Sequence, residues 1–97
     1  MYARVLKTNL KKATINEAAA EWKSHTEHYK KIGMKKAFML ADRKTGKFLS
    51  ITLWDNEDAL QKNSNSPEQA AGRKYMTEKY FEAAPSAEFF EIVGIIE

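Results

Sequence analysis

Between Ala41 and Leu60 the sequence ADRKTGKFLSITLWDNEDAL runs from a turn through a strand into a helix without a break. Its segment FLSITLW is rich in β-branched and aromatic residues, which favour a strand. The residues DNED that follow favour a helix start, because acidic side chains stabilise the positive N-terminal end of a helix. Strand and helix are therefore joined by a very short loop, and Trp54 occupies the corner between them. We expect Trp54 to be buried there, as a structural anchor of the helix entry.

Two helices are predicted, and each has its own start. The first covers Thr14–Ile32, with apolar residues at helical spacing, the T-x-x-E pattern of a capping box at its beginning, and Gly33 as a stop. The second follows the strand that ends at Trp54 and is capped by Asp55 or Asn56. The segment NSNSP interrupts it, and Pro67 restarts it at a first-turn position where the missing N–H costs little.

Four strands complete the element order, which is β-α-β-β-α-β. Two such β-α-β units build a four-stranded antiparallel sheet with both helices on one face, a ferredoxin-like α+β layout. With 97 residues, we expect one domain that spans 1–97. The predicted strands are Tyr2–Lys7, Met34–Arg43, Phe48–Trp54 and Glu88–Glu97.

Neither face of this predicted sheet has a clean polar pattern. In the third strand Leu49, Ile51 and Leu53 point to one face, while the other face begins and ends with Phe48 and Trp54. An antiparallel sheet that is open to water on one side alternates more sharply than this. The helices cover one face only, so a second copy of the chain is the simplest cover for the other. We therefore expect a homodimer.

Composition limits the classes of partner. The 16 basic residues exceed the 13 acidic ones by three and are interspersed with them, a balance that does not demand a nucleic-acid partner. There is no cysteine for a disulfide framework or a thiolate site. No apolar run approaches the length of a membrane span, and the N-terminal residues look like a strand rather than a signal peptide. We expect a cytoplasmic protein that binds neither nucleic acid nor membrane.

The stretch GMKKAFMLADRKTGKFLSITLWDNEDALQ, from Gly33 to Gln61, resembles the antibiotic biosynthesis monooxygenase-like group of the dimeric α+β barrel superfamily. The resemblance lies in the glycine before the second strand, the charged hairpin with Thr-Gly, and the strand that ends in Leu-Trp before an acidic helix start. It implies two sheets that face each other in a dimeric barrel, and a ligand cavity between helices and sheet in each subunit. It also implies cofactor-independent oxygenation of aromatic polyketides or quinols, or haem degradation.

Four residues are candidates for a substrate site. His25 lies at the edge of the apolar stripe of the first helix, and a neutral imidazole there can accept a proton from a phenolic substrate. Trp22 and Tyr29 flank it at helical spacing and can bind an aromatic ligand, although stripe residues more often belong to a core. Asn9, just after the first strand, can polarise a substrate oxygen, although turn chemistry explains it equally well. A half-buried structural histidine is the competing interpretation of His25.

Metal and haem chemistry have less support. Glu21, His25 and His28 fall on one side of the first helix, but one helix supplies only part of a metal shell, and a solvated flank is the better interpretation. Haem-degrading relatives carry a tryptophan inside the second helix and a histidine that ligates iron later in it. The segment Asp55–Met76 contains neither residue type. We therefore expect no metal site and no cofactor.

Two alternatives to an enzyme remain open. A dimer that binds a small aromatic or apolar molecule without transforming it would have the same sequence pattern. An RNA-recognition module shares the β-α-β-β-α-β order and needs aromatic rings at alternate positions on the open face of its third strand. Here Phe48 is followed by Ser50 and Thr52 at those positions, which disfavours RNA binding.

Overall fold

The computed structural model describes all 97 residues, and it confirms the order β-α-β-β-α-β with one interrupted helix. The interruption divides the second predicted helix into α2 and α3, and two short 3-10 segments flank the first helix. The elements are β1 (Tyr2–Asn9), η1 (Lys12–Thr14), α1 (Ile15–Thr26), η2 (Glu27–Ile32), β2 (Met34–Ala41), β3 (Lys47–Trp54), α2 (Glu57–Ser64), α3 (Pro67–Lys79) and β4 (Ser86–Glu91).

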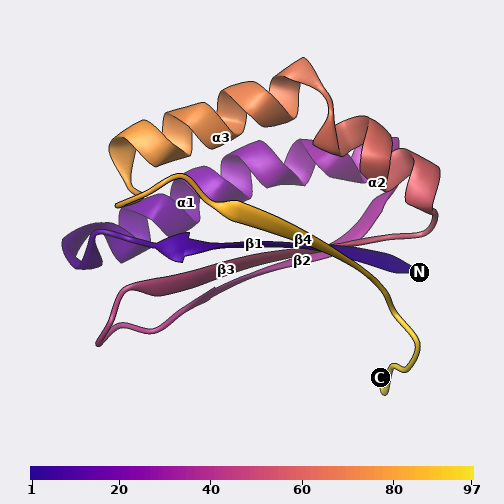
Figure 1. Cartoon of the computed structure of the whole chain (residues 1–97), viewed down its shortest axis with the longest axis horizontal. Helices are drawn as coiled ribbons and strands as arrows, with labels where there is room; N and C mark the ends of the chain where they lie inside the picture. Colours follow the sequence, from indigo (N-terminus) through magenta and orange to yellow (C-terminus); the bar gives the residue numbers. More distant parts are fainter.

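The four strands form one antiparallel sheet in the order β2-β3-β1-β4, with all helices on one face, as Figure 1 shows. This is the ferredoxin-like α+β arrangement expected from the element order. The central strand β1 pairs with β3 on one side and β4 on the other, so its side chains lie in the middle of both faces. None of the helices has both the length and the apolar character that crossing a membrane requires.

The first predicted helix is α-helical only as far as Thr26, after which η2 continues it as a 3-10 helix to Ile32. Gly33 ends it with a φ of 112°, and a Cβ there would lie 2.9 Å from the Ala59 Cβ. The predicted capping box is wrong. The η1 turn precedes the helix and holds Thr14 away from an extended conformation, so its hydroxyl donates to the Lys11 carbonyl at 2.7 Å instead of accepting a helix N–H.

The start signals of the other two helices operate as the sequence predicts. The Asn56 side chain accepts the Ala59 N–H at 2.8 Å and caps α2. Ser66 Oγ accepts the Gln69 N–H at 3.1 Å and caps α3, whose first residue is Pro67. These caps place α2 directly after Trp54 and let the chain bend once between α2 and α3.

The last strand is shorter than predicted. We expected it to cover Glu88–Glu97, but β4 ends at Glu91 and the following residues have no regular secondary structure. The register between β1 and β4 explains this end. Glu91 lies opposite Tyr2, so beyond Glu91 only Met1 remains for pairing on the side of β1. The Met1 carbonyl accepts the N–H of Ile92 at 2.8 Å, and pairing stops there.

The core between helices and sheet consists of two hydrophobic clusters at opposite ends of the inner face. The first cluster contains Leu10, Ile15, Ala18, Phe48, Met76, Tyr80 and Phe81. The second contains Tyr29, Met34, Trp54 and Leu60. Between them lies a belt of buried polar residues, which we call the polar belt: Arg4, Thr26, Ser50, Thr52, Asn63 and Gln69.

Trp54 is fully buried, as its position at the strand–helix corner predicts. Its ring packs in the second cluster at 6.2 Å from the Tyr29 ring, and its indole N–H donates to Thr52 Oγ1 at 2.9 Å. Met34 and Leu60 close the cluster from β2 and α2. Trp54 therefore joins the sheet to the helical layer at this end.

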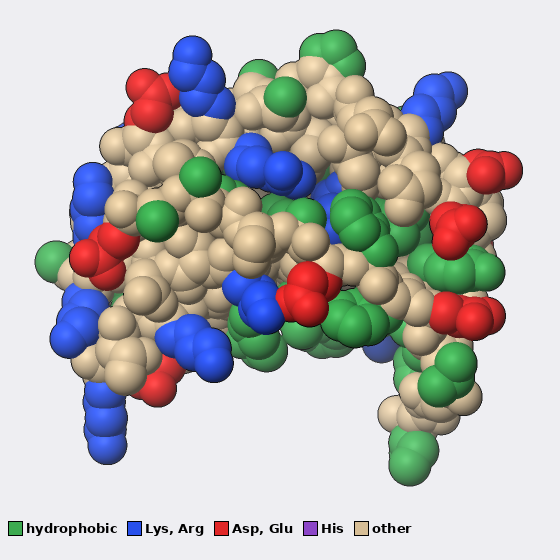
Figure 2. Space-filling view, viewed as in Figure 1, with side chains coloured by type: hydrophobic (Ala, Val, Ile, Leu, Met, Phe, Trp, Pro, Cys, Tyr) green, Lys and Arg blue, Asp and Glu red, His purple; other side chains and the backbone are tan.

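The face of the sheet without helices carries exposed apolar side chains. Phe38 is 45% exposed, Leu40 48% and Phe90 51%, and they surround half-buried aliphatic side chains of β1 and β3. Figure 2 shows hydrophobic side chains along the lower edge of the molecule, below the strands. Contiguous apolar surface of this kind marks an interaction site.

Replacing Trp54 by Ala should lower the free energy of unfolding by about 3–5 kcal/mol, because a fully packed indole leaves a cavity. Urea unfolding followed by circular dichroism measures the change. Trp54→Phe is the matched control, since it keeps most of the ring volume and should lose about 1 kcal/mol for the bond to Thr52. An Ala variant as stable as the wild type, with ligand binding lost, would assign Trp54 to a binding site instead.

Candidate functional site

A small cavity lies in the polar belt, enclosed by α1, η2 and α3 above and by the inner face of the sheet below. Its volume is about 50 Å³, room for a few water molecules rather than for a ring. Trp22, Phe48 and Phe81 supply apolar walls, whereas Arg4 and Arg73 supply charge. No Asp or Glu lines it. The cavity therefore combines apolar walls with two positive charges that no carboxylate in its lining balances.

A larger cleft of about 770 Å³ adjoins this cavity between η2 and the helices α2 and α3. Its volume lies within the range of small-molecule sites, about 300–1,000 Å³. His25 and Tyr29 line both the cavity and the cleft, so they stand at the border between the two.

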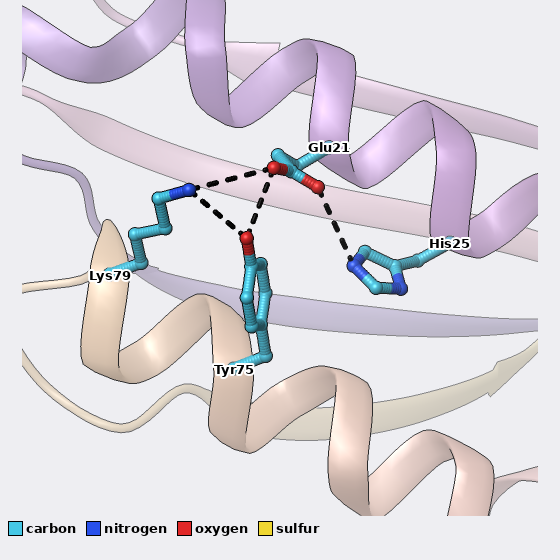
Figure 3. Close-up of polar contacts among 4 residues, drawn as sticks. All are labelled: Glu21, His25, Tyr75 and Lys79. Carbon is cyan, nitrogen blue, oxygen red and sulfur yellow. Dashed lines mark hydrogen bonds and ion pairs between the residues drawn. The ribbon is translucent and has the colours of Figure 1, made fainter.

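His25 projects from α1 at this border, and its side chain is 42% exposed. Its Nε2 lies 3.8 Å from the Glu21 carboxylate, one helical turn earlier, and its ring lies 5.4 Å from that of Tyr75. Figure 3 shows one ring nitrogen turned towards Glu21, while the other points away from it. The Glu21 carboxylate therefore lies on the Nε2 side of the ring without a hydrogen bond to it, and Nδ1 has no protein partner within hydrogen-bond distance.

Glu21 is the centre of a surface cluster that links α1 to α3, drawn in Figure 3. It accepts the Tyr75 hydroxyl at 3.1 Å and pairs with Lys79 Nζ at 3.7 Å, and Lys79 also donates to Tyr75. Contacts with both tyrosines beside it raise the pKa of the fully exposed Lys79. His28 lies on the exposed side of η2 and lines the cleft. No group of three His, Asp or Glu side chains in the chain is arranged to hold a metal ion.

Trp22 and Tyr29 both line the cavity, and the polar atom of each already has a protein partner. The Trp22 indole N–H donates to Ser50 Oγ at 2.8 Å. The Tyr29 hydroxyl donates to Gln69 Oε1 at 2.8 Å. Burial raises the pKa of Tyr29, so its hydroxyl stays protonated at neutral pH. These two residues offer ring surface to a ligand rather than free donors.

Asn9 is not brought to the other candidates. It is exposed at the end of β1, outside both the cavity and the cleft, and its carbonyl accepts the Glu82 N–H at 2.8 Å. The structure thus brings His25, Trp22 and Tyr29 together around the cavity and leaves Asn9 at the end of β1. The turn interpretation of Asn9 fits its position.

Arg4 is the residue of this site that sequence analysis missed. Its side chain is 2% exposed on the inner face of β1, and Nη1 donates to Asn63 Oδ1 at 2.8 Å and to Ser64 Oγ at 2.9 Å. The guanidinium lies 5.7 Å from the centre of the Trp54 ring. Every ion pair in the chain joins other residues, so this buried charge has no carboxylate partner. A charged residue at an inward position of the central strand was the available signal.

Burial, with a smaller contribution from the neighbouring Arg73, lowers the pKa of Arg4 to about 10. The side chain is still charged at neutral pH, because that value lies well above 7. Compared with the ordinary value of 12.5, this shift costs the folded state about 3 kcal/mol. The site therefore holds a positive charge at the expense of stability, which is typical of functional positions.

The chain matches no protein-family model, and no curated protein matches it in sequence. Solved structures do match its fold. A monooxygenase of Streptomyces coelicolor, solved in complex with nanaomycin D, superimposes with a TM-score of 0.82 at 19% identity, covering 99% of this chain and 90% of that one. A structure of an antibiotic biosynthesis monooxygenase gives 0.73 at 14% identity, with 97% and 100% covered. The chain has the antibiotic biosynthesis monooxygenase fold.

A third match carries the same fold without an assigned role. A Nitrosomonas europaea protein of unknown function gives a TM-score of 0.76 at 16% identity, covering 99% of this chain and 92% of that one. The antibiotic biosynthesis monooxygenase fold is therefore compatible with sequences that differ at most positions. Activity must be argued from the residues around the cavity.

Replacing Arg4 by Met should change the free energy of unfolding by no more than about 2 kcal/mol. The variant removes a charge that costs about 3 kcal/mol but leaves Asn63 Oδ1 and Ser64 Oγ without a donor, at about 1–3 kcal/mol. Urea unfolding measures the sum. Arg43→Met, in the exposed turn, is the control with the same change in charge. A loss of more than about 3 kcal/mol would make Arg4 a structural residue.

Proposed function

We propose that the protein is a cofactor-independent monooxygenase that acts on a small aromatic substrate of the quinol or polyketide-like type. In such a reaction the substrate itself supplies the electrons, one oxygen atom of O2 enters the substrate, and the other leaves as water. The observation that carries the proposal is the border position of His25, beside aromatic walls, in a fold shared with a ligand-bound monooxygenase.

In this proposal His25 is the general base. Its Nδ1 takes the proton of a substrate hydroxyl, because imidazole exchanges protons near neutral pH. The Glu21 carboxylate, 3.8 Å from Nε2, stabilises the imidazolium that forms, and the exposed part of the side chain allows the proton to pass on to water. Tyr29, at the border, contacts the ring of the substrate through its own ring, while Trp22 forms part of the wall of the cavity that receives the substrate hydroxyl.

We further propose that the active form is a homodimer, with the open sheet faces packed against each other as a barrel. The exposed apolar side chains Phe38, Leu40 and Phe90 support this, since no part of the chain covers them. Val93 and Ile96, in the C-terminal tail, are 91% and 100% exposed and add apolar surface beside the sheet. Interfaces of obligate dimers bury about 2,000 Å² or more.

Analytical ultracentrifugation at micromolar concentration should show twice the 11.1 kDa of one chain. Phe38→Asp places a charge on the open face and should shift the equilibrium towards monomer. Ile32→Asp is the control, because Ile32 is equally exposed but lies on η2 at the helical side. A stable wild-type monomer would remove the barrel, and a monomer that binds RNA in a salt-dependent way would favour the RNA-binding alternative.

His25→Ala should lower the rate of oxygen uptake with a quinol substrate by about a hundredfold or more, the usual scale for a lost general base. His28→Ala is the matched control and should have little effect on turnover, since His28 lines the cleft but not the cavity in which the substrate hydroxyl is ionised. An oxygen electrode and a panel of quinols and polyketide-like phenols provide the measurement. Undiminished turnover in a folded His25→Ala variant would exclude His25 from the chemistry.

The second candidate function is a dimer that binds a small aromatic molecule without transforming it. The internal hydrogen bonds of Trp22 and Tyr29 favour this alternative, because both residues present rings without free donors. Binding of the same panel, detected by tryptophan fluorescence, without any oxygen uptake would support it over the enzyme.

A further inference from the structure

The buried side-chain atoms that lack a hydrogen-bond partner are all donors. They are Arg4 Nε, Arg73 Nε and Asn63 Nδ2. Arg4 and Arg73 line the same cavity, and Asn63 is bonded to Arg4 through its oxygen. Buried donors without partners are rare because each one costs stability. What this cavity lacks is an acceptor.

The charges around the cavity identify the kind of acceptor. Two guanidinium groups line it without any carboxylate, and neither of them takes part in an ion pair. Glu68 lines the adjoining cleft rather than the cavity, and Glu21 lies outside the cavity beside His25. An incoming anion would meet two positive charges and unpaired N–H groups, where bonds are charge-assisted and strong.

We propose that Arg4 and Arg73 form an oxyanion-binding site, and that it receives the ionised hydroxyl of a phenol. This inference rests on the proposed function and deepens it, because it specifies the form in which the aromatic substrate is held. Arg4 supplies the fully buried charge, and Arg73 closes the site from α3.

The size of the cavity favours a phenolate over other anions. About 50 Å³ admits a single oxygen substituent, whereas even benzene needs a cavity of about 150 Å³. The ring therefore remains at the border with the larger cleft, between His25 and Tyr29. A tetrahedral phosphate suits this place less, because Trp22 and Phe48 make part of the cavity wall apolar.

Two groups take part in the ionisation of the phenol: His25 accepts the proton, and Arg4 stabilises the oxygen anion. The O–H bond of the phenol breaks, its proton forms an N–H bond on His25 Nδ1, and the electron pair stays on the oxygen beside Arg4. The imidazolium then returns its proton to water through its exposed side. Positive charge already held in the cavity stabilises the phenolate, and this favours transfer of the proton from the phenol to the imidazole.

The test uses 4-nitrophenol, which ionises near neutral pH and absorbs visible light only as the anion. At a pH where most of it is free and neutral, adding the wild-type protein should raise the absorbance of the anion. Its neutral methyl ether, 4-nitroanisole, should bind about tenfold to a hundredfold more weakly, the value of a hydrogen bond to a charged group. Equal binding of the two probes would overturn the proposal.

Arg4→Met should abolish the rise in anion absorbance, while Arg43→Met, which makes the same change in charge on the surface, should keep it. Gly72→Leu is a second variant that tests the same site without changing the charge of the protein. Gly72 is one of the residues around the cavity, and a Cβ there meets nothing within 4 Å, so a leucine fits without a clash and should obstruct the opening through which the anion enters. Gly94→Leu, also in open space, is its control. Nitrophenolate binding that survives both Arg4→Met and Gly72→Leu would refute the site.

Two readouts separate this inference from the function on which it rests. Nitrophenolate binding that depends on Arg4, without oxygen uptake on any quinol, would establish the oxyanion site and refute the enzyme. Oxygen uptake that Arg4→Met leaves unchanged would support the enzyme and refute the oxyanion site. Inorganic phosphate that binds the wild type while 4-nitrophenol does not would also overturn the assignment to a phenolate.

Discussion

A single layer of helices covers the sheet from one side, and this constraint shapes the rest of the molecule. All helices lie on one face, so the inner side chains of β1 and β3 must fill the whole interior (Figure 1). They do so with hydrophobic clusters at the two ends of the inner face, around Phe48 and around Trp54. The opposite face keeps Phe38 and Phe90 half exposed. The core and the apolar outer face are two consequences of the same layering.

The middle of the inner face departs from a hydrophobic core. Along β3 the inward row reads Phe48, Ser50, Thr52, Trp54, and the register places Arg4 of β1 opposite Thr52. Large rings at the two ends hold the helices at a distance from the sheet, while short hydroxyl side chains between them leave room. The buried guanidinium occupies part of that room, and the cavity is what remains. The buried charge and the unfilled space make the polar belt less stabilising than an apolar core, but they give the interior a charged surface.

The similarity of folds at 19% identity or less shows which features the architecture needs. Layer packing tolerates changes of side chain as long as volume and polarity pattern persist. Chemistry is less tolerant, because it depends on individual groups at particular distances. The shared fold therefore accounts for the layers of the molecule, whereas the proposal of an ionised phenol depends on Arg4, Arg73 and His25 of this chain.

Local signals in the sequence were sufficient to predict the element order, the buried Trp54 corner and the start of α3 at Pro67, because each depends on neighbouring residues. They were also sufficient to place His25, Trp22 and Tyr29 on one side of a helix. The end of β4 could not be predicted, since it depends on where β1 runs out of residues to pair with.

Arg4 could not be recognised either, because a lone arginine in a short strand is usually solvated. Only the pairing of β1 between β3 and β4, under α2, buries it against Asn63 and away from every carboxylate. The sequence by itself thus determined the layers and the residues of the helical wall. The tertiary structure alone decided where an unpaired charge would lie, because charge balance in a cavity depends on contacts between segments far apart in the chain.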